Sequence, residues 1–208
     1  MARIPESERL KEITALDRPL WETPGVVLAG MDEVGRGPLA GPVVVGCIVM
    51  PSDPLIPYVN DSKKLSEKRR ECIYASLLET SIAHTTGWIW PEEIDRINIL
   101  EATKNAFVQA FTKMPVQVTD VLIDALQGLK IPAKQHVYIH GDARSYSIAA
   151  ASILAKVARD RYMAQQDALY PQYGFARNKG YGTAEHIEAI KAYGPCPIHR
   201  RSFIQKWI

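Results

Sequence analysis

The apolar residues of the chain occur in runs that predict strands separated by helices. Long apolar runs at about 26–33 and 42–50 are typical of buried strands, and the Gly- and Pro-rich segment between them predicts a turn. Residues 82–90 predict a third strand, and the short apolar runs at 118–125 and 136–141 predict two more. These strands are enough to form one sheet.

Helical periodicity fills the segments between and after these strands. The predicted helices are 5–16, 67–79, 91–113, 147–166, 183–192 and 198–206. Ser66 is a suitable N-cap for 67–79, whose predicted apolar face contains Cys72, Ile73, Leu77 and Leu78. The helix at 147–166 carries many small residues on one face, which predicts close packing on the sheet. Strands followed by alternating helices and strands indicate an α/β fold, with a mixed central sheet flanked by helices.

The length of the chain favours one domain with an appendage over two full domains. At 208 residues it can bury one core. We assign residues 1–170 to this core domain, with residues 1–25 as an N-terminal helix and extension. Residues 171–208 are basic, aromatic and punctuated by Gly and Pro, which predicts a helical C-terminal extension that contacts substrate rather than a second core.

Composition excludes several classes of protein. The 47% of hydrophobic and 23% of charged residues are typical of a soluble globular protein. The three cysteines, Cys47, Cys72 and Cys196, form no CxxC pair, which argues against disulfides and zinc and favours a reducing compartment. The charged N-terminus does not resemble a secretory signal, and no apolar run approaches the roughly 18 residues of a membrane span. We therefore expect a soluble, cytoplasmic protein.

The net charge of only +2 hides two local basic patches. Residues 61–70 contain five Lys and Arg against Asp61 and Glu67, and residues 171–208 contain six against Glu185 and Glu188. Basic patches beside clustered acids suit a polyanion that is held over a metal site.

Acidic residues end the predicted strands. Asp32 and Glu33 close the first apolar run, where adjacent like charges are costly unless a cation compensates them. Gly35 would allow the bend that brings both carboxylates to one site. Asp124 ends the run at 118–125 in the same way, whereas Asp120 lies four residues earlier, roughly 13 Å away in an extended strand, and is predicted to be solvated. Hard carboxylate oxygens of this kind are the ligands that Mg²⁺ prefers.

Two further aspartates compete for the same role. Asp142 follows the strand at 136–141, but spacing alone would make it an ordinary turn aspartate. Asp160 lies between Arg159 and Arg161 late on a helix, which predicts a role in ion pairs. His136 and His140 lie in a predicted strand and do not repeat the helical zinc motif, and the chain has no Walker loop or nucleophile elbow.

Six blocks of sequence resemble the bacterial type 2 ribonucleases H (ribonuclease HII) and occur in the order typical of that family. They are "DEVGRGPLAGPVV" (32–44), "NDSKKLSEKRRE" (60–71), "VLIDA" (121–125), "GDARSYSIAAASILAKVARDR" (141–161), "NKGYGTAEH" (178–186) and "YGPCPIHRRSF" (193–203). The resemblance implies a ribonuclease H-like fold with a helical C-terminal extension. It does not reach the N-terminal 25 residues, to which we assign no function.

The resemblance implies a metal-dependent endonuclease that cleaves RNA in RNA–DNA hybrids and single ribonucleotides embedded in duplex DNA. Cleavage would occur 5′ to the ribonucleotide and leave a 3′-hydroxyl and a 5′-phosphate. Asp32, Glu33, Asp124 and Asp142 match the four active-site acids of the family, which favours Asp142 over Asp160. These acids would bind two Mg²⁺ or Mn²⁺ ions.

The resemblance also implies a set of substrate-binding residues. They are Gly35, Arg36, Gly37, Lys63, Lys64, Arg144 and Tyr181. The Gly-Arg-Gly segment and Tyr181 would recognise the ribonucleotide, and the lysines would contact phosphate. The chain departs from the family pattern at His140, where Lys is usual, and at Gly182, which is often Pro.

Two other functions compete with this hypothesis. A junction resolvase-like nuclease of the same fold would use clustered acids but would not need to sense a 2′-hydroxyl. A non-catalytic hybrid-binding module would gain nothing from acids that repel phosphate. The predicted partners are RNA–DNA hybrid and ribonucleotide-containing duplex DNA, with no membrane and no obligate protein partner, and we expect a monomer.

Overall fold

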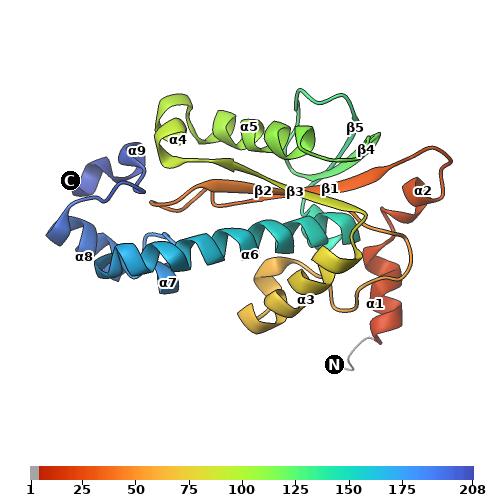
Figure 1. The fold of residues 1–208 in the computed structure, drawn as a ribbon, viewed down its shortest axis with the longest axis horizontal. Helices are drawn as coiled ribbons and strands as arrows, with labels where there is room; N and C mark the ends of the chain where they lie inside the picture. The colour runs from red at the N-terminus through yellow and green to blue at the C-terminus, as the bar shows by residue number, and fades with distance from the viewer. Residues whose placement is uncertain (1–4) are drawn as a thin grey trace.

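The structure, a computed structural model, describes residues 5–208. Its centre is a five-stranded sheet with the strand order β3-β2-β1-β4-β5 (Figure 1). The strands are β1 (Leu28–Val34), β2 (Val43–Val49), β3 (Ala83–Ile89), β4 (Asp120–Asp124) and β5 (Lys134–Tyr138). The first three strands pair antiparallel and β1, β4 and β5 pair parallel, so the predicted mixed sheet is confirmed.

The parallel pairing of β1 with β4 brings two strand ends together. Met31 pairs with Ile123, so Asp32 and Asp124 are the next residues of two adjacent strands. Neighbouring strands lie about 4.8 Å apart. The two carboxylates therefore emerge side by side at one edge of the sheet.

Helices cover both faces of the sheet (Figure 1). The helix α5 (Ile99–Thr112) packs on one face and α6 (Tyr146–Leu169) on the other. Gly30 and Gly46 allow the close approach of α6, because a Cβ on either residue would lie 2.1 to 2.4 Å from the helix backbone. The prediction of close packing by a small-residue helix is confirmed.

Two details of the predicted helices are wrong. The segment predicted as one helix at 91–113 is α4 (Pro91–Ile97) followed by α5, because Asn98 has a positive φ of 70° that interrupts the helix and caps α5 with its side chain. Ser66 caps α3 (Glu67–Thr80) as predicted. However, only Ile73 and Leu77 of its predicted apolar face are buried, whereas Cys72 and Leu78 are exposed.

The N-terminal segment packs on the core and forms α1 (Glu6–Ile13) and α2 (Arg18–Trp21). Between them, the fully buried carboxylate of Asp17 accepts hydrogen bonds from Ser145 Oγ and from the backbone N–H groups of Tyr146 and Ser147, at 2.9 to 3.1 Å. An acceptor at this position satisfies free N–H groups of a helix N-terminus. The segment therefore fixes the start of α6.

The C-terminal segment is helical, as predicted, and contains α7 (Phe175–Asn178), α8 (Ala184–Tyr193) and α9 (Arg201–Ile204). It buries an apolar cluster against the end of α6, which includes Met163, Phe175 and Ile190. The segment is thus packed onto the core domain by a small core of its own. Within residues 5–208, no helix is long and apolar enough to cross a membrane.

Candidate active site at the strand ends

Asp32 and Asp124 occupy adjacent positions at the ends of β1 and β4. Asp32 is only 5% exposed, and its Oδ1 accepts a hydrogen bond of 2.8 Å from the N–H of Glu33. Oδ1 of Asp124 accepts a bond of 2.8 Å from the N–H of Gly141, in the turn that follows β5. This bond ties the turn after β5 to the end of β4.

That turn places Asp142 beside the other two acids. It is the short 3₁₀ helix η2 (Gly141–Ala143), in which Asp142 is 5% exposed. The Nζ atom of Lys63 lies 3.8 Å from Asp142 Oδ2. The side chain of Lys63 is largely exposed, so this pair is an open one at the rim of the site.

Glu33 completes the group. Its Oε1 lies 3.5 Å from Nη1 of Arg36, and its side chain is mostly buried. Burial raises the pKa of Glu33, Arg36 lowers it, and the charge of Asp124 raises it again, with a net increase. Glu33 is therefore close enough to Asp124 for their charges to interact.

The remaining carboxylates also repel one another. Burial raises the pKa of Asp32 well above its usual value, and the charges of Glu33, Asp124 and Asp142 raise it further. Burial likewise raises the pKa of Asp142, with contributions from Asp61 and Asp124 that Lys63 only partly offsets. The protein thus gathers four acids in a space where it supplies too little positive charge to balance them.

This group is suited to hard divalent cations. Carboxylate oxygens are the donors that Mg²⁺ and Mn²⁺ prefer. A cation would compensate both the burial and the mutual repulsion that raise these pKa values. Within the described part of the chain, no three His, Cys, Asp or Glu side chains are arranged to enclose an ion by themselves. The acids are close enough to influence one another, but an ion would need further ligands from outside the protein.

Two neighbours of these acids were missed in the sequence. Ser152 on α6 lies beside Asp32 and lowers the pKa of that carboxyl, which counteracts part of the rise. Its hydroxyl lies 2.9 Å from Ser62 Oγ. Asp61, counted above only as part of a basic patch, lies next to Asp142 and accepts a bond from the Lys63 N–H. Neither position carries a local sequence pattern that would indicate its proximity.

A buried arginine holds the backbone of the Gly-Arg-Gly segment in place. Arg200 donates hydrogen bonds to the carbonyl oxygens of Gly35, Arg36 and Gly41 at 2.6 to 3.0 Å. Gly35 has a φ of +96°, and a Cβ there would lie 2.6 Å from the carbonyl oxygen of Pro42, so only glycine fits. Burial, and then the neighbouring charge of Arg159, lower the pKa of Arg200 to about 9, which leaves it charged at neutral pH.

A second buried arginine joins this segment to the C-terminal extension. Arg159 donates to the carbonyl oxygens of Ala40 and Pro42 and to that of Lys179, at 2.9 to 3.1 Å. Its guanidinium lies 6.0 Å from the centre of the Tyr181 ring. Arg159 therefore fixes the loop of Tyr181 against the Gly-Arg-Gly segment.

The structure brings Tyr181 and Gly37 to face each other. A Cβ on Gly37 would lie 3.9 Å from Cε1 of Tyr181, and Tyr181 is 42% exposed. The surface between them is therefore open and lined by one ring and one backbone segment.

Two buried histidines hold the backbone of Tyr181. Nδ1 of His199 accepts from the N–H of Cys196 at 3.0 Å, so the proton of His199 is on Nε2. It donates to Nε2 of His186 at 3.0 Å, and Nδ1 of His186 then donates to the carbonyl oxygen of Tyr181 at 2.9 Å. This chain requires both rings to be neutral. Consistently, burial and the charge of His186 lower the pKa of His199 to about 4, and burial lowers the pKa of His186.

The other predicted contact residues lie around the rim. Lys64 and Arg144 line a hollow next to η2, and Arg144 also lies 5.7 Å from the centre of the Tyr138 ring. His140 has a left-handed conformation immediately before η2. Gly182 approaches Leu39, whose Cδ1 would lie 3.1 Å from an added Cβ.

The two rejected aspartates both form ion pairs. Asp160 pairs with Lys156 at 2.7 Å and Arg70 at 3.9 Å, which confirms its predicted role with different partners. The prediction that Asp120 is solvated is wrong, because it is 7% exposed and pairs with His136 at 2.7 Å. It does lie at the far end of β4 from Asp124, as the spacing required.

Comparison with known proteins agrees with this architecture. A model of the family "Ribonuclease HII" matches residues 29–206. The ribonuclease HII of Caldanaerobacter subterraneus subsp. tengcongensis is 48% identical over 201 residues, which cover 97% of this chain and 83% of that protein. The ribonuclease HII of Desulfitobacterium hafniense is 50% identical over 204 residues, or 97% of this chain and 78% of that one. The solved structure of ribonuclease H2 from Pyrococcus horikoshii covers 86% of this chain and 96% of its own, with a TM-score of 0.74 and 29% identity.

Proposed function

This chain belongs to the ribonuclease HII family and is thus a type 2 ribonuclease H, and from that premise we propose its substrates and the roles of its residues. It cleaves RNA in RNA–DNA hybrids and also single ribonucleotides embedded in duplex DNA. Cleavage occurs 5′ to the ribonucleotide and leaves a 3′-hydroxyl and a 5′-phosphate. The reaction depends on Mg²⁺ or Mn²⁺.

One observation supports this proposal above all others: four mutually repelling carboxylates from β1, β4 and η2 gather at one edge of the sheet. Asp32, Glu33, Asp124 and Asp142 supply the oxygen donors for two ions. When bound, the ions activate the attacking water and stabilise the leaving oxygen. Because the protein alone does not enclose an ion, we expect phosphate oxygens of the substrate to complete the site.

The open surface between Gly37 and Tyr181 supports recognition of the ribonucleotide. The backbone from Gly35 to Gly37 can approach the sugar closely, and the 2′-hydroxyl is the group that distinguishes RNA from DNA. The exposed ring of Tyr181 packs on the neighbouring deoxyribose. During recognition of the ribonucleotide, the side chain of Arg36 stays next to Glu33, and the backbone of the segment contacts the sugar.

The cations at the rim bind phosphate. Lys63 already lies near Asp142, so a phosphate held by the acids and their ions would also meet its ammonium group. Lys64 and Arg144 flank the same turn and extend the contact to adjacent phosphates. These contacts orient the strand and carry no sequence information.

A cleavage assay tests the proposal. The substrate is a DNA duplex with one ribonucleotide and labelled ends, incubated with Mg²⁺ or Mn²⁺ and, in parallel, with EDTA. We expect one cut 5′ to the ribonucleotide, abolished by EDTA, and no cut in the same duplex made of DNA alone. Cleavage of the all-DNA duplex, or binding without any cleavage, would contradict the proposal.

A further inference from the structure

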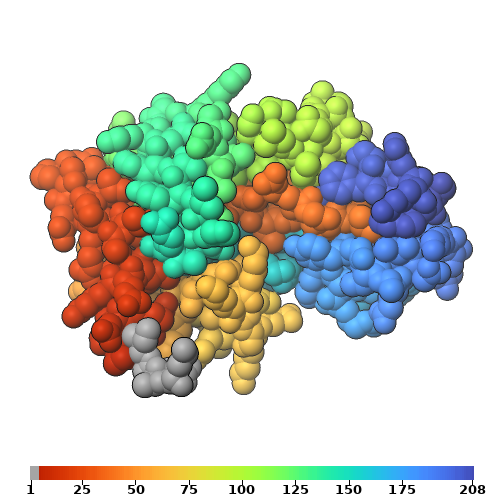
Figure 2. Space-filling view, turned by 180° about the vertical axis from the view of Figure 1, so that it is seen from behind, coloured from red at the N-terminus to blue at the C-terminus, as the bar shows by residue number. Residues whose placement is uncertain are grey.

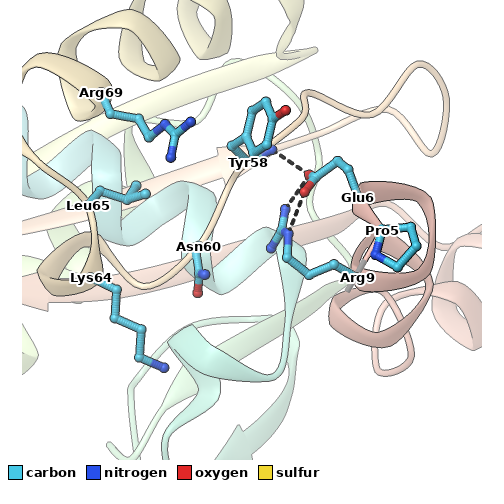
Figure 3. A pocket seen from close by; sticks show the side chains of 8 residues that line it. All are labelled: Pro5, Glu6, Arg9, Tyr58, Asn60, Lys64, Leu65 and Arg69. Carbon is cyan, nitrogen blue, oxygen red and sulfur yellow. Dashed lines mark hydrogen bonds and ion pairs between the residues drawn. The ribbon is translucent and has the colours of Figure 1, made fainter. Parts of the chain in front are cut away.

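A hollow outside the group of acids lies between α1 and the segment that leads into α3 (Figure 3). Its volume is ≈ 560 Å³, and Arg9, Asn60, Lys64 and Arg69 are among the residues that line it. A second hollow of ≈ 370 Å³ shares Arg9, Asn60 and Lys64 with the first and extends to Arg144. The two therefore form one groove, which we call the α1 groove.

The charge of the α1 groove is positive. Its cations are Arg9, Lys64, Arg69 and Arg144, against the acids Glu6 and Glu12. Glu6 is already neutralised, because Arg9 donates two hydrogen bonds of 2.7 and 2.9 Å to it and the Tyr58 N–H donates a third. Consistently, these bonds lower the pKa of Glu6, that of Arg9 foremost.

Three of the cations have no acidic partner within the described residues. No carboxylate of residues 5–208 lies within 4.0 Å of a charged nitrogen of Lys64, Arg69 or Arg144. Instead, Arg69 lies over the Tyr58 ring at 4.6 Å, and Arg144 lies near Tyr138. Aromatic faces orient a guanidinium without neutralising it. These side chains therefore remain available to an anion.

The α1 groove begins at the proposed active site. Arg144 follows Asp142 by two residues, and Lys64 follows Lys63, whose ammonium group lies 3.8 Å from Asp142. Figure 2 shows the N-terminal segment in red beside the gold segment that leads into α3, on the same face as the teal segment that contains η2. A nucleic-acid strand bound at the acids could therefore continue directly into the groove.

One wall of the groove comes from the N-terminal segment, which precedes the residues that the family model matches. The match begins at residue 29, whereas Arg9 lies on α1. Arg9 is held in place, because its Nη1 also donates to the carbonyl oxygen of Val59 at 2.8 Å. The N-terminal segment thus has a fixed position over the groove.

Building on the function proposed above, we propose that the α1 groove binds the sugar–phosphate backbone of the duplex that flanks the cleaved position. Lys64, Arg69 and Arg144, its cations without an acidic partner, would contact successive phosphates beyond the one held at the acids. Arg9, which is paired with Glu6, holds the wall of the groove in place. The N-terminal segment would then form one wall of this binding surface, in addition to fixing the start of α6. Continuity with the carboxylates favours a nucleic acid over an acidic peptide as the occupant.

Salt-dependent binding tests this proposal with the full chain. The probe is a DNA duplex with one ribonucleotide, measured in EDTA so that it stays intact. Each lost phosphate contact should make the slope of log K against log salt shallower by about 0.9. Between roughly 50 and 200 mM salt, the affinity of the variant should therefore fall by a factor about three times smaller than that of the wild type. We expect this change for Lys64→Ala and for Arg69→Ala, whereas Arg69→Lys, which keeps the charge, should restore most of the slope.

Shortened duplexes give a sharper version of the test. With one flank removed so that DNA no longer reaches the groove, Arg69→Ala should bind as the wild type does, while removal of the other flank should leave its defect intact. The control is Arg96→Ala, an exposed arginine on α4 across the sheet, which should behave as the wild type on every duplex. An unchanged slope in both variants, or the same defect on all three duplexes, would overturn the groove proposal. Failure of the wild type to cleave with metal would instead overturn the proposed function, and the binding measurements would still report on the groove.

Discussion

Two groups of buried polar side chains adjoin the Gly-Arg-Gly segment, and they differ in how completely their hydrogen-bonding and charged groups are paired. In the C-terminal group, Arg159 and Arg200 donate to backbone carbonyl oxygens, and His186 and His199 form a chain of hydrogen bonds. At the strand ends, Asp32, Glu33 and Asp142 face one another and all have raised pKa values.

The difference separates a structural role from a chemical one. Buried polar groups stabilise a fold when each donor and acceptor has a partner. Buried like charges without a partner cost stability, and they are expected where a ligand supplies the missing charge. The C-terminal group, which we call the satisfied group, holds two loops in place. The acids at the strand ends, which we call the unsatisfied group, are left to bind metal and phosphate.

The largest effect should come from neutralising one acid of the unsatisfied group. Asp124→Asn keeps the shape of the side chain but removes a charge that would hold the ions. Loss of a residue that only orients a metal ligand typically costs 10- to 100-fold, so loss of the ligand itself should reduce cleavage by about 1000-fold or more. Single-turnover cleavage of the ribonucleotide duplex measures this, and binding should stay largely intact.

Asp120→Asn is the matched control at the other end of the same strand. Burial raises the pKa of Asp120, but the hydrogen bonds from His136 and Thr119 outweigh it and produce a net decrease. Asp120 therefore belongs to the satisfied kind, and its variant should lose stability but keep the wild-type cleavage rate. Near-normal turnover in Asp124→Asn would remove Asp124 from the mechanism.

A smaller effect, and one limited to acid pH, should come from the histidine chain. The pKa of His199 falls from 6.5 to about 4 on folding, so the unfolded chain binds the extra proton in this interval. The stability from neutral His199 is present above pH 6.5 and is lost as the pH falls toward 4, a change of about 3 kcal/mol at 1.36 kcal/mol per pKa unit. Urea unfolding at a series of pH values measures this contribution as the difference between the wild type and His199→Asn. The raised pKa values of the clustered carboxyls act in the opposite direction in both proteins and cancel in that difference.

His199→Asn should remove most of that decline. The amide can still accept from the Cys196 N–H and donate toward His186, but it does not titrate. His84→Asn, at an exposed position, is the control and should retain the wild-type pH dependence. If His199→Asn loses stability with pH as steeply as the wild type, the histidine chain is not what titrates.

The next effect in size concerns Arg200, which holds the backbone of the Gly-Arg-Gly segment. Arg200→Lys keeps the positive charge but cannot reach the carbonyl oxygens of Gly35, Arg36 and Gly41 together. Buried carbonyl groups left without a donor should lower the free energy of unfolding by about 2 kcal/mol. Cleavage at a single ribonucleotide should show a higher KM with little change in kcat.

Arg201→Lys is the control for this variant. Its side chain is exposed, and substitutions at such positions usually change stability by less than about 0.5 kcal/mol. Equal stability of the two lysine variants would show that the carbonyl contacts of Arg200 contribute little.

Much of the fold and the core of the site were predictable because the features that define them are local. Apolar runs ending in acids marked Asp32, Glu33 and Asp124, and the parallel pairing of β1 with β4 then brings two of them together. Asp142 has no such pattern and could be favoured only by the family resemblance. Asn98 breaks a helix that its neighbours favour, and the break depends on a backbone conformation that the sequence pattern does not encode.

The roles of Arg159 and Arg200 could not be predicted because their hydrogen-bond partners are backbone atoms far away in the sequence. Arg200 bonds to a carbonyl 165 residues away and Arg159 to one 117 residues away, and a carbonyl oxygen has no side-chain identity that a sequence could reveal. Asp120 was misjudged for a related reason, since its partner His136 comes from the adjacent strand β5. Spacing along one strand does not show what the next strand supplies.

The smallest effect, and the one that tests how the two groups cooperate, should come from Tyr181. The satisfied group fixes its backbone through His186 and its loop through Arg159, while its exposed ring faces Gly37. Tyr181→Ala removes the ring. Stacking of an aromatic ring on a base is worth about 1–3 kcal/mol, and we expect packing on the smaller sugar to lie at the lower end of that range. Cleavage at a single embedded ribonucleotide should therefore fall about tenfold, whereas binding to plain DNA duplex should change far less.

Tyr181→Phe keeps the ring and should retain activity, and Tyr193→Ala, an exposed tyrosine at the end of α8, is the control. Equal losses on both duplexes would mean that Tyr181 contributes to general binding, and the C-terminal group would then hold a surface that does not distinguish RNA from DNA.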